Sequence, residues 1–496
     1  MNDVRKLFAA LALLAVMAVS CRRGRPAERS LELPDWQPEM ARTPARWLEE
    51  EPIRLLRDYV RIDTRNPPGR ERPGAEFLKR YLDCEGIPSE LICPDRDRCN
   101  LYSRLPGRSR NKAILLLNHI DVVPVADSLW TKPPFGGTIE KSYLYGRGSY
   151  DMKSIAISQL LAYVDLFHSG LLPDRDVVFL AECGEELGGT DGVPWIYEHR
   201  PDVLAGVDLV LNEGGYEEVV AGVPRYIGIE VGQGGMAYAI LGSDDPAVLR
   251  PEETFRSLDL FVPPAPALAQ FFDAISEFRP PFFANAFRHP ELLKLPEVRK
   301  WIPYQNLSLV TGGIWRQPPF EGRLLPEFSG GYQWGAVAMV SLPLGVDPKP
   351  YFTPLLERLE SRGAHVIFSL CGPPGTASPF PTADTNAIRR VLQAVAPGVP
   401  VIPLVNSFSG TTSLEFRKRG VPAYGFTPFQ IDPFDAARRH GNDERIFLPF
   451  YTRGVGTMRE VLFEVSGALT ENRASSNQEL TKIVAFSGKL TLSCLD

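Results

Sequence analysis

A histidine and an aspartate of the types that bind and orient metal ions follow an apolar stretch of this chain. Residues 114–117 are all apolar, as expected for a strand buried on both faces, and His119 and Asp121 follow where that strand should end. Because side chains alternate along a strand, Asp121 could hydrogen-bond one ring nitrogen of His119 while the other binds a metal. A core histidine followed by a helix-capping aspartate is the commoner explanation of so short a motif.

Further carboxylates and a second histidine occur downstream at comparable places. Residues 177–181 and 209–211 are also apolar and are interpreted as buried strands, with helical segments between them. The candidate ligands that follow these strands, or lie in loops near them, are Asp151, Glu185, Glu186, Glu213 and His440. The pattern predicts an α/β fold whose mostly parallel sheet is flanked by helices and carries its site at the strand ends.

The ordered set of motifs resembles a known family, the co-catalytic zinc exopeptidases and amidases. That family includes aminoacylase, glutamate carboxypeptidase, carboxypeptidase S and succinyl-diaminopimelate desuccinylase. The resemblance rests on the HID, GRGSYDMK, AECGEELGG, NEGG and RHGNDERI segments and runs from about residue 52 to about residue 465. The NEGG and YGFTP segments are most similar to the branch of carboxypeptidase S and the N-acyl-amino-acid hydrolases.

The resemblance implies two divalent metal ions per chain. One ion would be held by His119, Asp151 and Glu213, and the other by Asp151, Glu186 and His440, so that Asp151 bridges them. Zinc is the first choice for such a mixed nitrogen and oxygen set, and manganese or cobalt are alternatives. The implied reaction is hydrolysis of a peptide or N-acyl amide bond, with a small peptide or an N-acyl amino acid as substrate.

Two further carboxylates are candidates for catalytic roles. By the resemblance, Glu185 matches the general base, which takes a proton from the attacking water and hands it to the leaving nitrogen. By the alternation of side chains along the strand, Asp121 would orient His119. Since neighbours on an extended segment point to opposite sides, we expect Glu185 to lie beside the ions without binding them, while Glu186 binds.

The chain departs from the family pattern where substrate is held. The family's lid carries a histidine that reaches across a dimer interface, but residues 241–246 here read LGSDDP. Ser341 stands near the position of a substrate-binding arginine, and Thr412 where many members have aspartate. A homodimer is therefore an open expectation, and His289 is a lid histidine to test. The alternative function is a lipid-anchored binding or scaffold protein that keeps the metal site with little turnover, although the intact Glu185 argues against it.

The length of 496 residues favours two domains. The family resemblance implies a smaller α+β lid inserted into the α/β domain. The expected boundaries are 46–228 and 372–470 for the catalytic domain, 229–371 for the lid, and 471–496 for a tail of unknown role.

The N-terminus predicts export. Arg5 and Lys6 precede an apolar run, and the end of that run, Ala18-Val19-Ser20-Cys21, is similar to a bacterial lipobox. We expect residues 1–21 to be a signal and Cys21 to be a lipid anchor in the cell envelope, with simple cleavage and a periplasmic or secreted protein as the alternative. Residues 22–45 would then be a tether.

The remaining composition argues against a nucleic-acid partner and leaves undecided whether two cysteines form a disulfide. The net charge is −6 and the chain has no long basic run, which argues against a nucleic-acid partner. In an oxidising compartment Cys93 and Cys99 could close a short loop, and free buried cysteines are an equally good interpretation.

Overall fold

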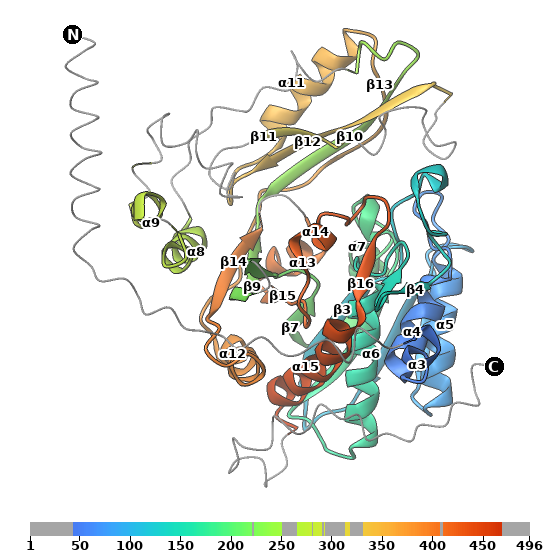
Figure 1. The fold of residues 1–496 in the computed structure, drawn as a ribbon, viewed down its shortest axis with the longest axis vertical. Coiled ribbons are helices and arrows are strands. Elements are labelled where there is room, and N and C mark those ends of the chain that lie inside the picture. The colour runs from blue at the N-terminus through green and yellow to red at the C-terminus, as the bar shows by residue number, and fades with distance from the viewer. Residues whose placement is uncertain are drawn as a thin grey trace.

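The computed structural model describes residues 43–220, 223–249, 265–279, 281–289, 292, 313–317, 331–406 and 410–468. These residues form a larger domain and a smaller one, which stands above the larger in Figure 1. The predicted signal, the lipid anchor at Cys21 and the tail lie outside the described residues, as does the predicted tether up to residue 42. Within the described ranges, no helix combines the length and the apolar character needed to span a membrane.

The larger domain is built on a nine-stranded sheet in the order β1-β2-β6-β3-β7-β15-β9-β14, with β8 paired to β9. The strands are β1 (Ser89–Ile92), β2 (Asn100–Leu105), β3 (Ser109–His119), β6 (Arg175–Glu182), β7 (Val207–Asn212), β8 (Glu217–Val220), β9 (Val223–Gln233), β14 (Val401–Asn406) and β15 (Ala423–Gly425). Parallel pairing joins β6, β3, β7 and β15 at the centre and β14 to β9, whereas β1, β2 and β8 pair antiparallel. The predicted α/β class with a mostly parallel sheet is confirmed.

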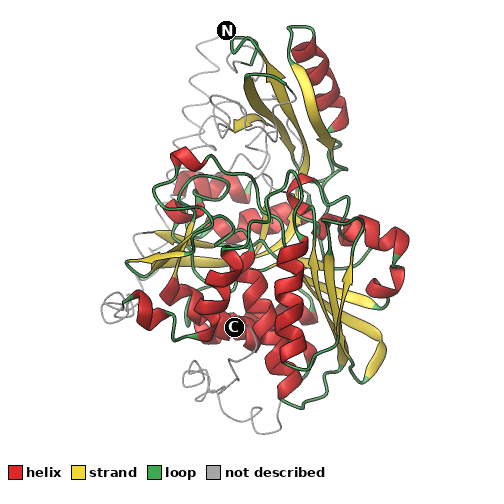
Figure 2. Ribbon diagram, turned by 90° about the vertical axis from the view of Figure 1, so that its right-hand side faces the viewer, coloured by secondary structure: helices red, strands yellow, loops and turns green. Residues whose placement is uncertain are grey.

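Helices flank this sheet, and their long members lie side by side in Figure 2. They are α3 (Pro44–Trp47), α4 (Glu51–Val60), α5 (Arg72–Cys84), α6 (Lys153–His168), α7 (Val193–His199), α12 (Ala383–Val395), α13 (Ser413–Arg417), α14 (Pro433–Ala436) and α15 (Leu448–Ser466), with short 3₁₀ turns at η1 (Asp127–Leu129), η2 (Glu185–Leu187) and η3 (Pro201–Leu204). Sequence signals mark some ends: Thr382 and Thr385 form a capping box at the start of α12, and α15 ends at Gly467, which is left-handed.

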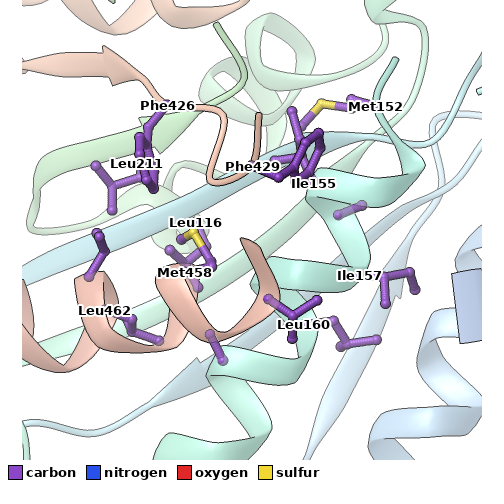
Figure 3. Packing of buried hydrophobic residues seen from close by; sticks show 14 of the residues in the cluster. Leu116, Met152, Ile155, Ile157, Leu160, Leu211, Phe426, Phe429, Met458 and Leu462 are labelled. Atoms are coloured by element: carbon purple, nitrogen blue, oxygen red, sulfur yellow. The ribbon is translucent and has the colours of Figure 1, made fainter. Parts of the chain in front are cut away.

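The main core lies where α6 and α15 pack on the sheet. Ile155 and Leu160 of α6 and Met458 of α15 meet Leu116 of β3 and neighbouring strand residues (Figure 3). Burying a side chain of this size stabilises the fold by roughly 1.5–3 kcal/mol. Because α6 is buried along nearly its whole length, the loop that precedes it is held in place from behind.

The smaller domain is an antiparallel sheet in the order β11-β12-β10-β13 with helix α11 packed against it. Its elements are β10 (Gly235–Ser243), β11 (Gly313–Gln317), β12 (Trp334–Leu342), α11 (Lys349–Glu360) and β13 (His365–Cys371). A separate apolar cluster of Ala237, Leu241, Val340 and Phe352 fills the space between helix and sheet.

Two parts of the stretch expected to be the lid, 229–371, belong to the larger domain. Strand β9 runs to Gln233 because its residues pair with β14 of the large sheet, so the small sheet begins at β10. Helices α8 (Pro266–Ser276) and α9 (Pro281–Arg288) pack on each other, and α8 packs on β14. Their apolar side chains, including Phe271 and Phe287, join the core of the larger domain. At the chain's start, α3 begins two residues before the expected boundary at residue 46.

A small second sheet and a disulfide complete the larger domain. A small sheet in the order β16-β5-β4 is made of β4 (Thr138–Glu140), β5 (Tyr143–Tyr145) and β16 (Arg445–Phe447). It joins the segment before α6 to the segment after α14. A disulfide between Cys93 and Cys99, one of the two alternatives open from the sequence, closes the loop before β2.

Candidate metal centre

The central strands end at one place and deliver four of the expected residues there. His119 is the last residue of β3, Glu213 directly follows β7, and Glu185 and Glu186 lie in η2 just beyond β6. Since β6, β3 and β7 are parallel neighbours, their carboxyl ends lie side by side. The structure thus brings these four residues together, as the strand pattern predicted.

Asp151 lies at the middle of the cluster, in the loop that leads into α6. Its Oδ1 lies 3.1 Å from Nε2 of His119, and its Oδ2 lies 3.0 Å from Nε2 of His440. His440 comes from the segment between α14 and β16. Each oxygen of one carboxylate therefore faces a different imidazole.

Two outer carboxylates extend the pattern on either side of Asp151. Oε1 of Glu213 lies 3.6 Å from Nε2 of His119, and Oε2 of Glu186 lies 3.2 Å from Nε2 of His440. Ligands about 2.0–2.2 Å from a tetrahedral ion stand roughly 3.3–3.6 Å apart, so these separations fit a metal's ligand set. Oε1 of Glu186 is buried with no hydrogen-bond partner, which also fits an ion.

Glu185 lies closer to the candidate ligands than its predicted role requires. Ligand atoms of His119, Glu185 and Glu213 lie within 4.8 Å of one another, as do those of His119, Asp151 and Glu186. The expectation that Glu185 and Glu186 alternate along an extended segment was wrong, because η2 is a 3₁₀ turn entered through Gly184. Proximity alone therefore does not separate the base from the ligands.

The electrostatics of this cluster are those of a site that requires cations. Burial raises the pKa of Glu213 to about 8, helped by the charge of Asp151. Burial also raises the pKa of Glu185 well above its usual range, with further contributions from Glu213 and Glu186. Burial opposes the charged form of His440, but Glu186 and Asp151 outweigh it and raise the pKa of that imidazole to about 10.

The sequence led us to expect a hydrogen bond between the Asp121 carboxylate and His119, but Oδ1 of Asp121 lies 3.7 Å from Nδ1 of the ring, too far for one. Nδ1 of His119 lies 2.9 Å from the backbone carbonyl of Asp121, which fixes the ring so that Nε2 faces the cluster. The Asp121 carboxylate instead accepts hydrogen bonds from the backbone amides of Glu185 and Glu186, each at 3.1 Å, and from the side chain of Asn66 at 2.9 Å. It therefore holds η2 rather than the imidazole.

Glu444 is a supporting residue that the sequence analysis missed. Its buried carboxylate accepts hydrogen bonds from the backbone amides of Gly148, Tyr150 and Asp151 and from the guanidinium of Arg147. It thus fixes the loop that carries the central aspartate. The signal available in the sequence was an acidic residue four positions after a candidate ligand histidine.

In the part of the smaller domain that the structure describes, a hydroxyl of β10 reaches the turn that carries the two glutamates. Tyr238 of β10 donates a hydrogen bond of 3.4 Å to the backbone carbonyl of Glu186. Leu370 of β13 packs on Gly188, where φ is +93°, a backbone conformation that strains any residue with a side chain, and an added Cβ would lie 2.5 Å from the leucine.

The other sequence-predicted positions lie away from the ligands or are only partly described. Thr412 lies beside Glu182, where its hydroxyl favours the ionised carboxylate against the larger effect of burial on that pKa. Ser341 is in β12, opposite Met236 of β10, and its side chain is outside the described part of the structure. His289 is exposed at the end of α9, in the larger domain, so it is not a lid histidine.

The chain matches a family of known proteins and individual relatives within it. The model of a family described as peptidase family M20/M25/M40 matches residues 115–464. Succinyl-diaminopimelate desuccinylase from Cereibacter sphaeroides is 37% identical over 145 residues, which are 29% of this chain and 37% of that protein. The chain thus spans about a third of the length of the curated relatives that it matches.

Solved structures share the fold across most of the chain. Human carnosine dipeptidase 1 has a TM-score of 0.63 at 15% identity, covering 85% of this chain and 97% of that one. The M20 family metallo-carboxypeptidase Sso-CP2 from Sulfolobus solfataricus has a TM-score of 0.60 at 17% identity, covering 84% and 99%. At these identities the likeness is one of fold.

Proposed function

Because the chain belongs to peptidase family M20/M25/M40, we propose that it is a metal-dependent hydrolase of peptide or N-acyl amide bonds. The observation that carries the proposal is Asp151, whose two oxygens each face a different imidazole. Two divalent ions a few ångströms apart need such a shared carboxylate. The matched relative is named a desuccinylase, and the two solved structures a dipeptidase and a carboxypeptidase. Cleavage of a C–N bond is the chemistry these names have in common.

The proposed ligand sets follow the short distances. His119, Asp151 Oδ1 and Glu213 would hold one ion, and Asp151 Oδ2, Glu186 and His440 the other. The mixed imidazole and carboxylate donors suit zinc best, with manganese or cobalt as alternatives.

The proposed roles of the chain's own groups follow from the same geometry. Bound here, the ions would supply a Lewis acid for the substrate carbonyl and a water of lowered pKa. Glu185 takes one proton from the attacking water as the new C–O bond forms, and delivers it to the nitrogen as the C–N bond breaks. Asp121 positions Glu185 by accepting a hydrogen bond from its backbone amide.

Tyr238 is the proposed source of a further donor to the developing oxyanion. Its hydroxyl comes from the same chain and lies against η2. In the family pattern a histidine reaches across from a partner subunit, and the sequence here has no histidine at the matching position, residues 241–246. The site would therefore be complete within one chain. Turnover per subunit should then stay within a few-fold on dilution to monomer, and a collapse of turnover with metal still bound would contradict this.

A substrate panel tests the function itself. Dipeptides and N-acyl amino acids would be incubated with the purified protein and added zinc, manganese or cobalt, with and without a chelator. We expect metal-dependent release of an amine and a carboxylate from at least one class. Metal binding without turnover of any compound would instead support the alternative, a binding or scaffold protein that keeps the site.

For its location, we propose export to the bacterial cell envelope with a lipid on Cys21. The Cys93–Cys99 disulfide suits an oxidising compartment, which supports export. Intact-mass measurement of protein made in a bacterial host would detect the acyl mass, and Cys21→Ser should lack it. A mature terminus downstream of Cys21 would contradict lipidation and leave simple cleavage.

A further inference from the structure

An arginine lies at the metal centre without a hydrogen-bond partner for its guanidinium. Arg439 immediately precedes His440, and its Nε lies 3.9 Å from Oδ2 of Asp151. That is an ion-pair contact that is too long for a hydrogen bond. The side chain is 41% exposed, so part of the guanidinium remains open to solvent beside the cluster.

The other cations near the centre already have partners. Arg147 pairs with Glu444, Arg98 pairs with Asp191 at 2.6 Å, and Lys153 donates to two backbone carbonyls at the end of α4. Among the described residues around the cluster, Arg439 therefore differs in that the acid it pairs with, Asp151, is itself a candidate metal ligand.

The neighbouring arginine shows that this placement is particular to one residue. Nε of Arg438 lies 3.8 Å from Asp435, and its Nη1 donates to the Asn442 carbonyl at 3.4 Å. Both contacts are made within its own segment. Two consecutive arginines thus differ: Arg438 braces the loop, and Arg439 faces the cluster.

Counting the charges at the site shows that Arg439 would be an unbalanced positive charge once ions are bound. Two divalent ions carry four positive charges, and Asp151, Glu185, Glu186 and Glu213 carry four negative ones when ionised, so these groups sum to zero. Arg439 adds one positive charge that it cannot lose, because a guanidinium stays protonated in proteins. If ions bind both oxygens of Asp151, that carboxylate is no longer free to pair with Arg439. The guanidinium would then need another anion, because it would otherwise lie unpaired beside the positive ions.

We infer that Arg439 binds the free carboxylate of the substrate, which is the terminal carboxylate of a peptide or of an N-acyl amino acid. The inference rests on the proposed function and names its recognition residue. An α-carboxylate is two bonds from the scissile nitrogen, so it lies within a few ångströms of the ions, where Arg439 is. The planar fork of a guanidinium matches a carboxylate in two parallel hydrogen bonds.

The test compares a carboxylate ligand with its neutral counterpart. N-acetyl-leucine and N-acetyl-leucinamide would be titrated by calorimetry into the metal-loaded full-length protein, and hydrolysis of both would be measured alongside. We expect the wild-type protein to bind the acid at least 10-fold more tightly than the amide. In Arg439→Gln the preference should fall below about 3-fold with metal content unchanged, and Arg438→Gln should retain the wild-type preference.

The outcomes separate this inference from the proposed function. An Arg439→Gln protein that keeps the wild-type preference would overturn the assignment, as would a wild-type protein that binds both ligands equally. If Arg439→Gln loses its metals, Arg439→Lys decides: a preference weakened at least 3-fold supports the assignment, and an unchanged one overturns it. If neither ligand is hydrolysed, the proposed function is in question, but the binding data still decide the role of Arg439.

Discussion

The two domains contribute to the centre in different ways. Every candidate ligand comes from the larger domain, where the Asp121 carboxylate holds the two glutamates of η2 and Glu444 holds the loop of Asp151. In the described part of the smaller domain, Tyr238 donates one long hydrogen bond to Glu186 of η2, and Leu370 packs on Gly188, the residue after η2. The comparison indicates that the chemistry is built into the larger domain and that the smaller one adjusts it. Changes in the larger domain should therefore cost more activity.

The largest effect is expected at Glu185. Glu185→Gln keeps the size and hydrogen-bonding capacity of the side chain but cannot accept a proton, so kcat should fall about 10²- to 10⁴-fold. Metal content, measured by elemental analysis on the same sample, should stay at the wild-type value. Activity within a few-fold of wild type would mean that another group is the base.

A smaller effect is expected from the smaller domain. Tyr238→Phe removes only the hydroxyl, and loss of one oxyanion donor typically costs 10²- to 10³-fold, so we expect a fall in kcat of about 10²-fold with little change in KM. Tyr332→Phe is the control, because Tyr332 packs on Gly242 near the other end of β10. Equal effects of the two substitutions would show that the Tyr238 hydroxyl has no special role.

A still smaller effect on activity is expected from Asn66, which supports η2 through Asp121. Asn66 donates to Asp121 and accepts from Arg98, which neighbours the disulfide at Cys99. Residues that support a metal site are typically worth 10- to 100-fold, so Asn66→Ala should lower activity or metal affinity about tenfold. Lys79→Ala, which removes an exposed ion pair on α5, should change neither. If Asn66→Ala also changes neither, η2 does not depend on this support.

The last effect is on stability and its dependence on pH. Burial raises the pKa of Glu182 from 4.5 to about 7, so the folded metal-free protein holds a proton that the unfolded chain releases. The stability from this group is present below pH 4.5 and is lost as pH rises through 7, a change of about 3 kcal/mol. Glu182→Gln should flatten the pH profile of unfolding free energy by about that amount in chelator-treated protein. Identical slopes in the variant and the parent would contradict the raised pKa.

The sequence predicted the part of the site that depends on local pattern. Apolar runs located β3, β6 and β7, and the polar residues at their ends, together with Asp151 and His440, meet in the structure. It did not predict how these residues are held. Whether Asp121 uses its carbonyl or its carboxylate depends on the position of η2, which comes from another strand.

The contributions of Glu444, Tyr238 and Arg439 were also hidden in the sequence. Each depends on contacts between segments far apart in the chain, and single residues in loops or on an amphipathic strand carry no periodic signal. The same reason explains why α8 and α9 were assigned to the lid: their packing on each other and on β14 joins segments that are far apart in the chain.

Metal stoichiometry tests the central claim most directly, because that claim is that one aspartate joins two ion sites in the larger domain. Elemental analysis of zinc-loaded wild-type protein should give two ions per chain, and Asp151→Ala should retain neither. Asp165→Ala, on the α6 helix that follows Asp151 and paired there with Arg459, should keep both. Two ions retained by a folded Asp151→Ala protein would contradict the bridging role and with it the proposed site.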